Sequence, residues 1–375
     1  MIPKKPNNCL RVAHTADWHL RDRHLDTSVR GPDFTAVALQ MVEDAKERDC
    51  DIIVNAGDVL NVSRPSSQNI KDLQRINKRL LELELPMLLI TGNHDMTKPT
   101  WISHFGRGSV GRFGIIPADH WTEVVESKDG QRVRFTCLPW MPREELADTL
   151  DAFTPSADTV EILVWHEAIR EFCGFPSEAR PTVKELQPEK FKAILLGDIH
   201  QRNYMETEEG CLIGYPGATE LCAKDEPLAH SYEILDIPFD GGPITHYPAP
   251  LKTRPVVTFH ATSESQVQPL IDKIKEQESE GPMVFVRYNP NIEKFVDRVR
   301  SAVSSDCILR LEPIGAVVLD LTSPTAGMED VRLEDLVPRF FTQMTSLCTL
   351  ATRLCNPQAQ PSILISEYTA EVMSR

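Results

Sequence analysis

Five apolar runs in this chain each end in residues that can bind a metal ion. The runs are rich in Val, Ile and Leu, a pattern typical of strands buried on both faces of an α/β sheet. In open sheets of this class, ligands bind where the strands end. We therefore expect the five strand ends to converge on one two-metal site. The residues at these ends are, in chain order, Asp17 and His19, Asp58, Asn93 and His94, His166, and Asp198 and His200.

Helix-like segments separate the predicted strands over roughly the first 240 residues. Apolar positions recur at intervals of three and four in residues 33–49 and again in residues 66–85, which predicts two amphipathic helices. Ser66 or Ser67 is the candidate N-cap of the second helix. Two α/β halves packed sheet against sheet fit this order. The chain is therefore expected to form a four-layer α/β/β/α sandwich.

A proline-rich stretch, residues 248–255, is the best candidate for a domain boundary. We expect residues 1–250 to form the first domain and residues 251–320, with their β-α-β-α-β pattern, to form a small α/β domain that caps it. Residues 321–375 contain a further helical stripe, a helical tail that either packs in a core or docks a partner. The residues of this stripe that we assign to partner binding are Leu336, Phe340, Phe341 and Met344.

The composition is that of an ordinary globular protein, and the formal net charge at pH 7 is −15. No run of about 18 apolar residues is present, so a membrane span is not expected. The nine cysteines include no CxxC pair, which favours reduced thiols in a cytoplasmic protein over a disulfide framework or a zinc site. The negative charge argues against tight DNA binding by the chain alone. Bound cations or a basic partner would restore positive charge locally.

The residue types at the strand ends suit hard divalent metals. Aspartate oxygens together with imidazole nitrogens suit Mn²⁺, Fe²⁺ or Zn²⁺, and the hard oxygen ligands favour Mn²⁺, with Mg²⁺ as the alternative. Two such ions about 3.5–4 Å apart can hold the attacking and leaving oxygens of a phosphate displacement. Asp58 can bridge the two ions. A glycine precedes Asp58, Asn93 and Asp198, which allows a tight turn where each strand ends.

The order of these motifs resembles that of the calcineurin-like metallophosphoesterases. The motifs are D-x-H at residues 17–19, GD at 57–58, GNHD at 92–95, a late His166 and a G-x-x-H that ends at His200. More narrowly, HTADWHL, GDVLNVSRPSS, GNHD and WHE resemble the double-strand-break nuclease subunits of the SbcD and meiotic recombination eleven type, phage versions included. The resemblance covers residues 10–220 by motif and the remainder by domain layout only.

The resemblance implies a role for each residue at the strand ends. The implied ligands of one metal are Asp17, His19, Asp58 and His200, and those of the second are Asp58, Asn93, His166 and Asp198. His94 is not a ligand in this scheme. It would donate a proton to the leaving oxygen or stabilise the charged transition state.

The resemblance also implies a reaction and a partner. The reaction is hydrolysis of DNA phosphodiester bonds, as an exonuclease on duplex ends and as an endonuclease on single strands or hairpins. The partner is an SbcC-like ATPase whose coiled coil contacts the C-terminal helices; whether two copies form a homodimer, as relatives do, is left open. Ser63, Arg64 and Ser66 lie where relatives contact the DNA backbone, although a helix cap explains Ser66 equally well.

Two positions depart from the family pattern. The last motif is GDIH where the family has GHxH, so Asp198 stands in place of an imidazole. With three carboxylates, two divalent ions retain one net positive charge instead of two, which predicts a harder metal preference and a less acidic bridging water. The second departure is Asn61, where many relatives have a His that orients the catalytic one. A less constrained His94 is expected as a result.

Two alternatives stay open at the level of sequence. The first is another enzyme of the same superfamily, a protein phosphatase or a cyclic-nucleotide phosphodiesterase. The motifs DWHL and SRPSS and the second domain argue against it, because such enzymes need none of them. The second alternative is a metal-poor scaffold that uses the fold to bind proteins, and the two departures are its only support.

Overall fold

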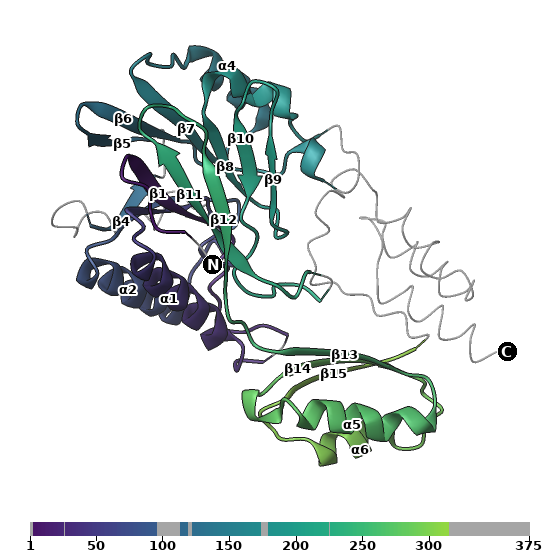
Figure 1. Ribbon diagram of the computed structural model, residues 1–375. Coiled ribbons are helices and arrows are strands. Elements are labelled where there is room, and N and C mark those ends of the chain that lie inside the picture. The colour runs from purple at the N-terminus through teal and green to yellow at the C-terminus, as the bar shows by residue number, and fades with distance from the viewer. Residues whose placement is uncertain are drawn as a thin grey trace.

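The computed structural model describes residues 3–25, 27–95, 113–118, 122–173, 179–224 and 226–314 (Figure 1). The helices of this part of the chain are α1 (Gly31–Glu47), α2 (Ser67–Glu82), α4 (Arg143–Ala152), α5 (Val267–Lys275) and α6 (Phe295–Ala302). The strands are β1 (Cys9–Thr15), β2 (Ile52–Asn55), β3 (Pro86–Ile90), β4 (Gly114–Ala118), β5 (Thr122–Lys128), β6 (Gln131–Cys137), β7 (Thr159–His166), β8 (Ala193–Gly197), β9 (Asn203–Glu206), β10 (Leu212–Tyr215), β11 (Ser231–Pro238), β12 (Thr245–Pro250), β13 (Val256–Ala261), β14 (Met283–Tyr288) and β15 (Ile308–Pro313).

Two six-stranded sheets form the larger part of the molecule. The first has the order β12-β11-β1-β2-β3-β4, and the second has the order β5-β6-β7-β8-β10-β9. In the first sheet, β1 to β4 run parallel and β11 and β12 are added antiparallel. In the second, β6, β7, β8 and β10 run parallel, and β5 and β9 are antiparallel edges. The strands that carry the candidate ligands therefore lie in the parallel part of each sheet.

The sheets pack face to face and helices cover their outer faces, as Figure 1 shows. One apolar core lies between the sheets, with β1, β2 and β3 on one side and β6, β7 and β8 on the other. A second core joins the first sheet to α1 and α2, and a third joins the second sheet to α4. Leu10 and Val12 face the inter-sheet core while Ala13 faces the helices, because successive side chains of a strand point to opposite faces. The predicted four-layer α/β/β/α order is confirmed.

Both helices predicted from apolar periodicity are present. The segment 33–49 corresponds to α1, whose first turn begins two residues earlier with Pro32 near its start. The segment 66–85 corresponds to α2. Ser66 is the N-cap: its hydroxyl accepts hydrogen bonds from the backbone amides of Gln68 and Asn69, and its own backbone amide donates to Oδ1 of the Asn69 side chain. This reciprocal capping explains why the helix starts there.

A smaller two-layer unit follows β12. It is a parallel sheet of order β13-β14-β15 with α5 and α6 packed on one face, as the β-α-β-α-β pattern predicts. The proline-rich stretch 248–255 is only partly a linker. Residues 248–250 belong to β12, an edge strand, where proline removes no ladder hydrogen bond that the sheet needs. Residues 251–255 make the connection. The division into domains at residue 250 and the helical tail of 321–375 stay predictions, and the tail lies outside the described residues.

No helix in the described part of the chain is long and apolar enough to cross a membrane.

At one place the two large sheets are joined by a polar contact as well as by apolar packing. His14 of β1 is fully buried, and its Nδ1 lies 2.6 Å from the hydroxyl of Tyr204 in β9. Burial lowers the pKa of His14 to about 3, because an imidazolium ion is poorly solvated between the sheets.

Acid is expected to weaken the fold through His14. An unfolded histidine has a pKa of about 6.5, so between pH 6.5 and 3 the unfolded chain binds this proton more readily than the folded chain. The stabilisation is present above about pH 6.5 and is lost as the pH falls, by roughly 1.4 kcal/mol per pH unit. Urea denaturation should therefore show a steeper loss of unfolding free energy between about pH 6.5 and 4.5 in the wild type than in His14→Gln. Equal slopes for the two proteins would contradict this.

Candidate metal centre

The candidate ligands come together at the carboxyl ends of strands from both large sheets. Asp17 and His19 follow β1, and Asp58 follows β2. His166 is the last residue of β7, and Asp198 and His200 follow β8. Six of the seven predicted ligands form one cluster, in which each side chain or backbone group lies within about 4 Å of another member. The seventh is Asn93, whose side chain is exposed beside His94; its role as a ligand stays a prediction.

One half of the cluster is built around His19. Its Nε2 lies 3.1 Å from Nε2 of His200, 3.7 Å from Oδ2 of Asp58 and 4.0 Å from Oδ1 of Asp17. Two imidazole nitrogens and two carboxylates thus face a common point. Two cationic imidazoles could not approach this closely, so at least one ring has a lone pair directed at that point. This is the donor set expected for a Mn²⁺-type ion.

The other half is built around His166. Its Nε2 lies 3.5 Å from Oδ1 of Asp58 and 3.9 Å from Oδ1 of Asp198. Asp58 therefore turns one oxygen towards each half, as a bridging ligand would require. His166 Nε2 is buried and has no hydrogen-bond partner among the described residues. A buried nitrogen without a hydrogen-bond partner destabilises a fold unless a ligand binds to it. The residues present therefore fit a bound metal.

Three imidazole rings of the site are oriented by contacts to their Nδ1 atoms. Nδ1 of His166 lies 2.6 Å from the carbonyl oxygen of Ala56, and Nδ1 of His200 lies 2.5 Å from Oε1 of Glu226. Nδ1 of His94 lies 3.0 Å from the carbonyl oxygen of Asn61. In each ring Nδ1–H donates to oxygen and Nε2 is left to face the cluster, which is the usual arrangement of metal-binding histidines.

The contact between His94 and the Asn61 carbonyl oxygen orients a ring that the sequence predicts to be less constrained. The main chain of Asn61 makes this contact, so the identity of that side chain matters less than its sequence position suggests. Glu226 was missed by the sequence analysis. It lies 26 residues beyond its partner His200 in a loop, and no periodicity or motif connects the two.

Burial and proximity shift the ionisation of the cluster. Burial raises the pKa of the Asp17 carboxyl to about 6 and lowers the pKa of His19 well below its usual value. Burial would also raise the pKa of Asp58, but the neighbouring His166 and His19 hold it well below the usual range. Burial opposes protonation of His166, yet Asp58 raises the pKa of that ring well above its usual value. Competing protons would leave this site when a cation enters.

The site is open on one side. Asp17, Asp58 and His166 are almost fully buried, whereas the side chains of His94 and His200 are 34% and 29% exposed. A substrate can therefore reach the cluster from the side of His94. Nε2 of His94 lies 3.9 Å from Oδ2 of Asp58, a distance like those within the cluster, and His94, His19 and Asp58 lie close enough to hold an ion together. That His94 is a proton donor and not a ligand stays a prediction.

Several candidate ligands have strained backbone conformations. Asp17, His19, Asp58 and Asp198 all have positive φ, of 52°, 45°, 53° and 93°. Residues other than glycine adopt this left-handed region at a cost, and such residues concentrate at functional sites. Asp95, which the GNHD motif places next to His94, holds the surrounding loops: it accepts hydrogen bonds from the amides of Val59, Leu60 and Gly92. Its carboxylate is not aimed at the cluster.

The glycines that precede three ligands serve two different purposes. Gly57 has a φ of 97°, so it provides the turn expected before Asp58. Gly92 and Gly197 do not have positive φ and are required by close approach. A Cβ on Gly92 would overlap the Asp58 carboxylate, and one on Gly197 would overlap the Ala56 carbonyl and the His166 ring. The predicted tight turn is therefore present at Gly57 but not at Gly92 or Gly197. Those two glycines leave room for neighbouring candidate ligands.

Asp198 has a cation beside it. Nη1 of Arg180 lies 3.7 Å from Oδ2 of Asp198, and the same nitrogen also pairs with Glu167. The carboxylate that replaces the expected imidazole is thus partly balanced by an arginine 18 residues earlier in the chain. No motif or periodicity in the sequence points to Arg180, which lies in a loop.

The candidate DNA-contacting residues lie just beyond Asp58 and before α2. Arg64 is exposed, and Ser63 and Ser66 are partly exposed. The Ser66 hydroxyl accepts the capping hydrogen bonds of α2 and donates to Asp22, so it is occupied. Arg64 is therefore the best placed of the three to contact a phosphate. The candidate partner-binding residues of the C-terminal stripe lie outside the described part of the chain.

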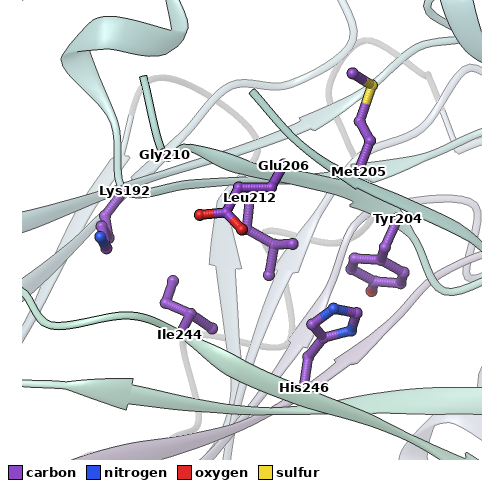
Figure 2. Close-up of a pocket in the computed structure, with 8 residues that line it drawn as sticks. All are labelled: Lys192, Tyr204, Met205, Glu206, Gly210, Leu212, Ile244 and His246. Carbon is purple, nitrogen blue, oxygen red and sulfur yellow. The ribbon is translucent and has the colours of Figure 1, made fainter. Parts of the chain in front are cut away.

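A cavity of about 150 Å³ is separate from the cluster. It lies between the edge strands of the two sheets and contains none of the candidate ligands; Figure 2 shows Tyr204 of β9 beside His246 of β12 in its wall. The other lining residues are Lys192, Met205, Glu206, Gly210, Leu212 and Ile244. His246 and Arg202 both pair with the buried Glu233, so the polar groups nearby are already satisfied. The strand-end cluster is the functional-site candidate.

Comparison with known proteins identifies relatives over most of the chain. The sequence profile described as "Calcineurin-like phosphoesterase" matches residues 10–202 of the 375. The chain is 25% identical over 335 residues to the "DNA double-strand break repair protein Mre11" of Methanosarcina acetivorans, covering 88% of this chain and 52% of that protein. It is 29% identical over 281 residues to the protein of the same name from Haloferax volcanii, covering 74% and 60%.

The chain spans only about half the length of the first of these curated relatives. Among solved structures, a dimetal phosphatase from Danio rerio aligns with a TM-score of 0.41 at 9% identity, covering 64% of this chain and 98% of that one.

Replacing Gly197 with alanine is expected to disrupt the half of the cluster around His166. The added Cβ would overlap the His166 ring and the carbonyl that orients it, so Mn²⁺ affinity at this position should fall by roughly tenfold or more. Isothermal titration calorimetry should give two Mn²⁺ ions per wild-type chain and a weakened second ion in Gly197→Ala. Gly242→Ala is the matched control, because a Cβ at that position would contact only the side chains of Asp240 and Pro238. Unchanged binding in Gly197→Ala would contradict the assignment.

Proposed function

We propose, since the chain belongs to the calcineurin-like phosphoesterase family, that it is a metal-dependent nuclease that hydrolyses DNA phosphodiester bonds. It would act as an exonuclease on duplex ends and as an endonuclease on single strands or hairpins. The observation that carries the proposal is the Asp58 carboxylate shared between His19 and His166. A shared carboxylate between two imidazole-containing donor sets is the arrangement that phosphoryl displacement with two ions requires.

The proposed ligands of the two ions are those implied by the motifs. Asp17, His19, Asp58 and His200 would hold one ion, and the second would be held by Asp58, Asn93, His166 and Asp198. We propose Mn²⁺, with Mg²⁺ as the alternative, because oxygen donors predominate. When bound, the two cations supply the positive charge that stabilises the phosphate oxygens during displacement. The buried carboxylates of this chain keep those charges in place.

His94 is the proposed proton donor. Its Nδ1–H donates to the Asn61 carbonyl oxygen, which keeps the ring from turning. Its Nε2 is then free to carry a second proton, and this nitrogen lies on the exposed side of the cluster. An imidazolium at this place would pass its Nε2 proton to the leaving oxygen of the cleaved bond, and its charge would stabilise the transition state.

DNA as the substrate is supported by the relatives rather than by the surface charge. Both relatives compared above carry a name that refers to DNA double-strand break repair. We propose that Arg64, with Ser63 and Ser66 nearby, contacts the DNA backbone and that the small domain of residues 251–320 selects the DNA. Because the net charge of the chain is −15, the bound cations and a partner must provide part of the positive charge.

The proposal includes a partner and a location. The partner is an SbcC-like coiled-coil ATPase that docks on residues 321–375, with a homodimer as a further possibility to test by sedimentation. The location is the cytoplasm. All seven cysteines of the described residues are free, which supports a reducing compartment.

The nuclease proposal is tested by a cleavage assay with Mn²⁺. Wild type should cut single-stranded and duplex-end DNA, and His94→Ala should lower the rate by roughly 10²–10⁴-fold, the usual contribution of a general acid. The ATPase subunit is added in a parallel arm. His94→Ala should still bind two Mn²⁺ ions, because His94 is not a proposed ligand. Cleavage of phosphopeptide or cyclic AMP without DNA cleavage would favour the phosphatase alternative, and fewer than one bound ion per chain would favour the scaffold.

Replacement of Asp198 by histidine tests the electrostatic account of the GDIH motif. The neutral ring removes one negative charge and leaves Arg180 paired with Glu167 alone, so the site becomes more positive. We expect the activity ratio of Zn²⁺ to Mn²⁺ to rise and the pH–rate profile to move to lower pH by up to about one unit. Asp240→His, an exposed site away from the cluster, is the control. If metal preference and profile both stay as in the wild type, the account fails.

A further inference from the structure

One loop segment connects the candidate ligand His200 with the small domain. It consists of residues 220–224 together with Glu226 and is called the connecting segment. It lies between β10 and β11 of the larger domain. Charged side chains make its contacts on both sides, and most of them are buried.

On one side, the connecting segment holds His200. Oε1 of Glu226 lies 2.5 Å from Nδ1 of His200, and Oε2 accepts a hydrogen bond of 2.7 Å from the amide of Cys222. Both oxygens of this carboxylate are therefore used, and the side chain is only 11% exposed. A carboxylate on the second nitrogen of a metal-binding imidazole orients the ring and increases its basicity. The position of Glu226 thus determines where Nε2 of His200 points.

On the other side, the connecting segment is held by Arg30 at the start of α1. Nη2 of Arg30 donates to the carbonyl oxygen of Leu221 at 2.9 Å and to Oε1 of Glu220 at 3.3 Å. Nη1 of Arg30 donates to Oδ2 of Asp33 at 2.8 Å. The Arg30 side chain is fully buried, and a buried guanidinium that loses its partners is strongly destabilising. Arg30 and the connecting segment are therefore constrained to move together.

Asp33 in turn holds the entry to the small domain. Arg254 immediately precedes β13, and its Nε and Nη2 donate to the two oxygens of Asp33 at 2.6 and 2.9 Å. Nη1 of Arg254 donates to the carbonyl oxygen of Gly281, just before β14. This bidentate pair is 15% and 19% exposed, so solvent screens it little. A second contact, between Lys224 and Glu312 of β15 at 3.6 Å, is more exposed and weaker.

We propose that the connecting segment couples the placement of the small domain to the metal ligand His200, with Glu226 as a positioning residue. This inference rests on the proposed metal site. The contacts run from Arg254 through Asp33 and Arg30 to the Leu221 carbonyl, and then from the amide of the next residue, Cys222, through Glu226 to His200. Such coupling is reciprocal. Metal bound at His200 stabilises the docked small domain, and DNA that moves the small domain changes the metal affinity.

Asp33→Asn tests the coupling from a position outside the metal site. The amide keeps the size of the side chain and removes the charge that Arg30 and Arg254 share. Mn²⁺ affinity, measured by calorimetry on the full chain, should fall by about fivefold or more. Arg254→Gln interrupts the same contact from the linker and should give a similar loss. Glu226→Gln should lower the affinity by about 10–100-fold.

The control is Glu43→Gln on the same helix. Glu43 pairs with Arg79 of α2 and makes none of the contacts of the connecting segment, so its loss should leave Mn²⁺ affinity unchanged. The double variant Asp33→Asn/Glu226→Gln should bind as weakly as Glu226→Gln alone, because the coupling passes through Glu226. Additive losses in the double variant, or wild-type affinity in both Asp33→Asn and Arg254→Gln, would overturn the proposal.

Hydrogen exchange provides a readout that does not depend on activity. Saturating Mn²⁺ should slow the exchange of amides in residues 251–261 of the wild type, and this protection should be absent from Asp33→Asn and Glu226→Gln. Protection that persists in both variants would contradict the coupling even when the nuclease assay succeeds. A wild type that binds Mn²⁺ and shows the protection but cuts no DNA would instead contradict only the proposed reaction.

Discussion

The buried carboxylate of Asp58 is the interaction on which the rest of this structure depends. One oxygen lies 3.7 Å from His19 of the first sheet, and the other lies 3.5 Å from His166 of the second. A buried carboxylate is costly unless it is paired, and His166 is available as a partner only when the two sheets meet with their strand ends aligned. The apolar core between the two sheets therefore does two things: it stabilises the sandwich, and it brings the two halves of the site together.

Several residues of the site adopt conformations that cost free energy, and the surrounding fold holds them in these conformations. Asp17, His19 and Asp58 adopt left-handed backbone, and Gly197 must lack a side chain so that the His166 ring can approach. Strands β1, β2, β7 and β8 enter the site from rigid sheets, so these conformations persist. Orientation of the rings comes from oxygens outside the cluster, including two main-chain carbonyls. The small domain adds to this support through the buried Arg30 and its partners.

Local patterns predict a large share of this fold. The helix expected over residues 33–49 and that expected over 66–85 both form, because apolar spacing reports directly which face of a helix is buried. The small domain follows its β-α-β-α-β pattern for the same reason. The proline-rich stretch is less well predicted: residues 248–250 pair as an edge strand, since prolines are tolerated where no further strand follows.

The sequence by itself determined the strands, the helices that separate them and the residue types at each strand end, because these depend on neighbours close along the chain. It also determined the order of motifs by which the family is identified. Only the tertiary structure decided which groups orient the candidate ligands. Glu226, Arg180 and the carbonyl of Asn61 reach the site from loops whose positions depend on packing between distant segments. No spacing along the chain encodes such contacts, because each joins loops that only the folded sheets bring together.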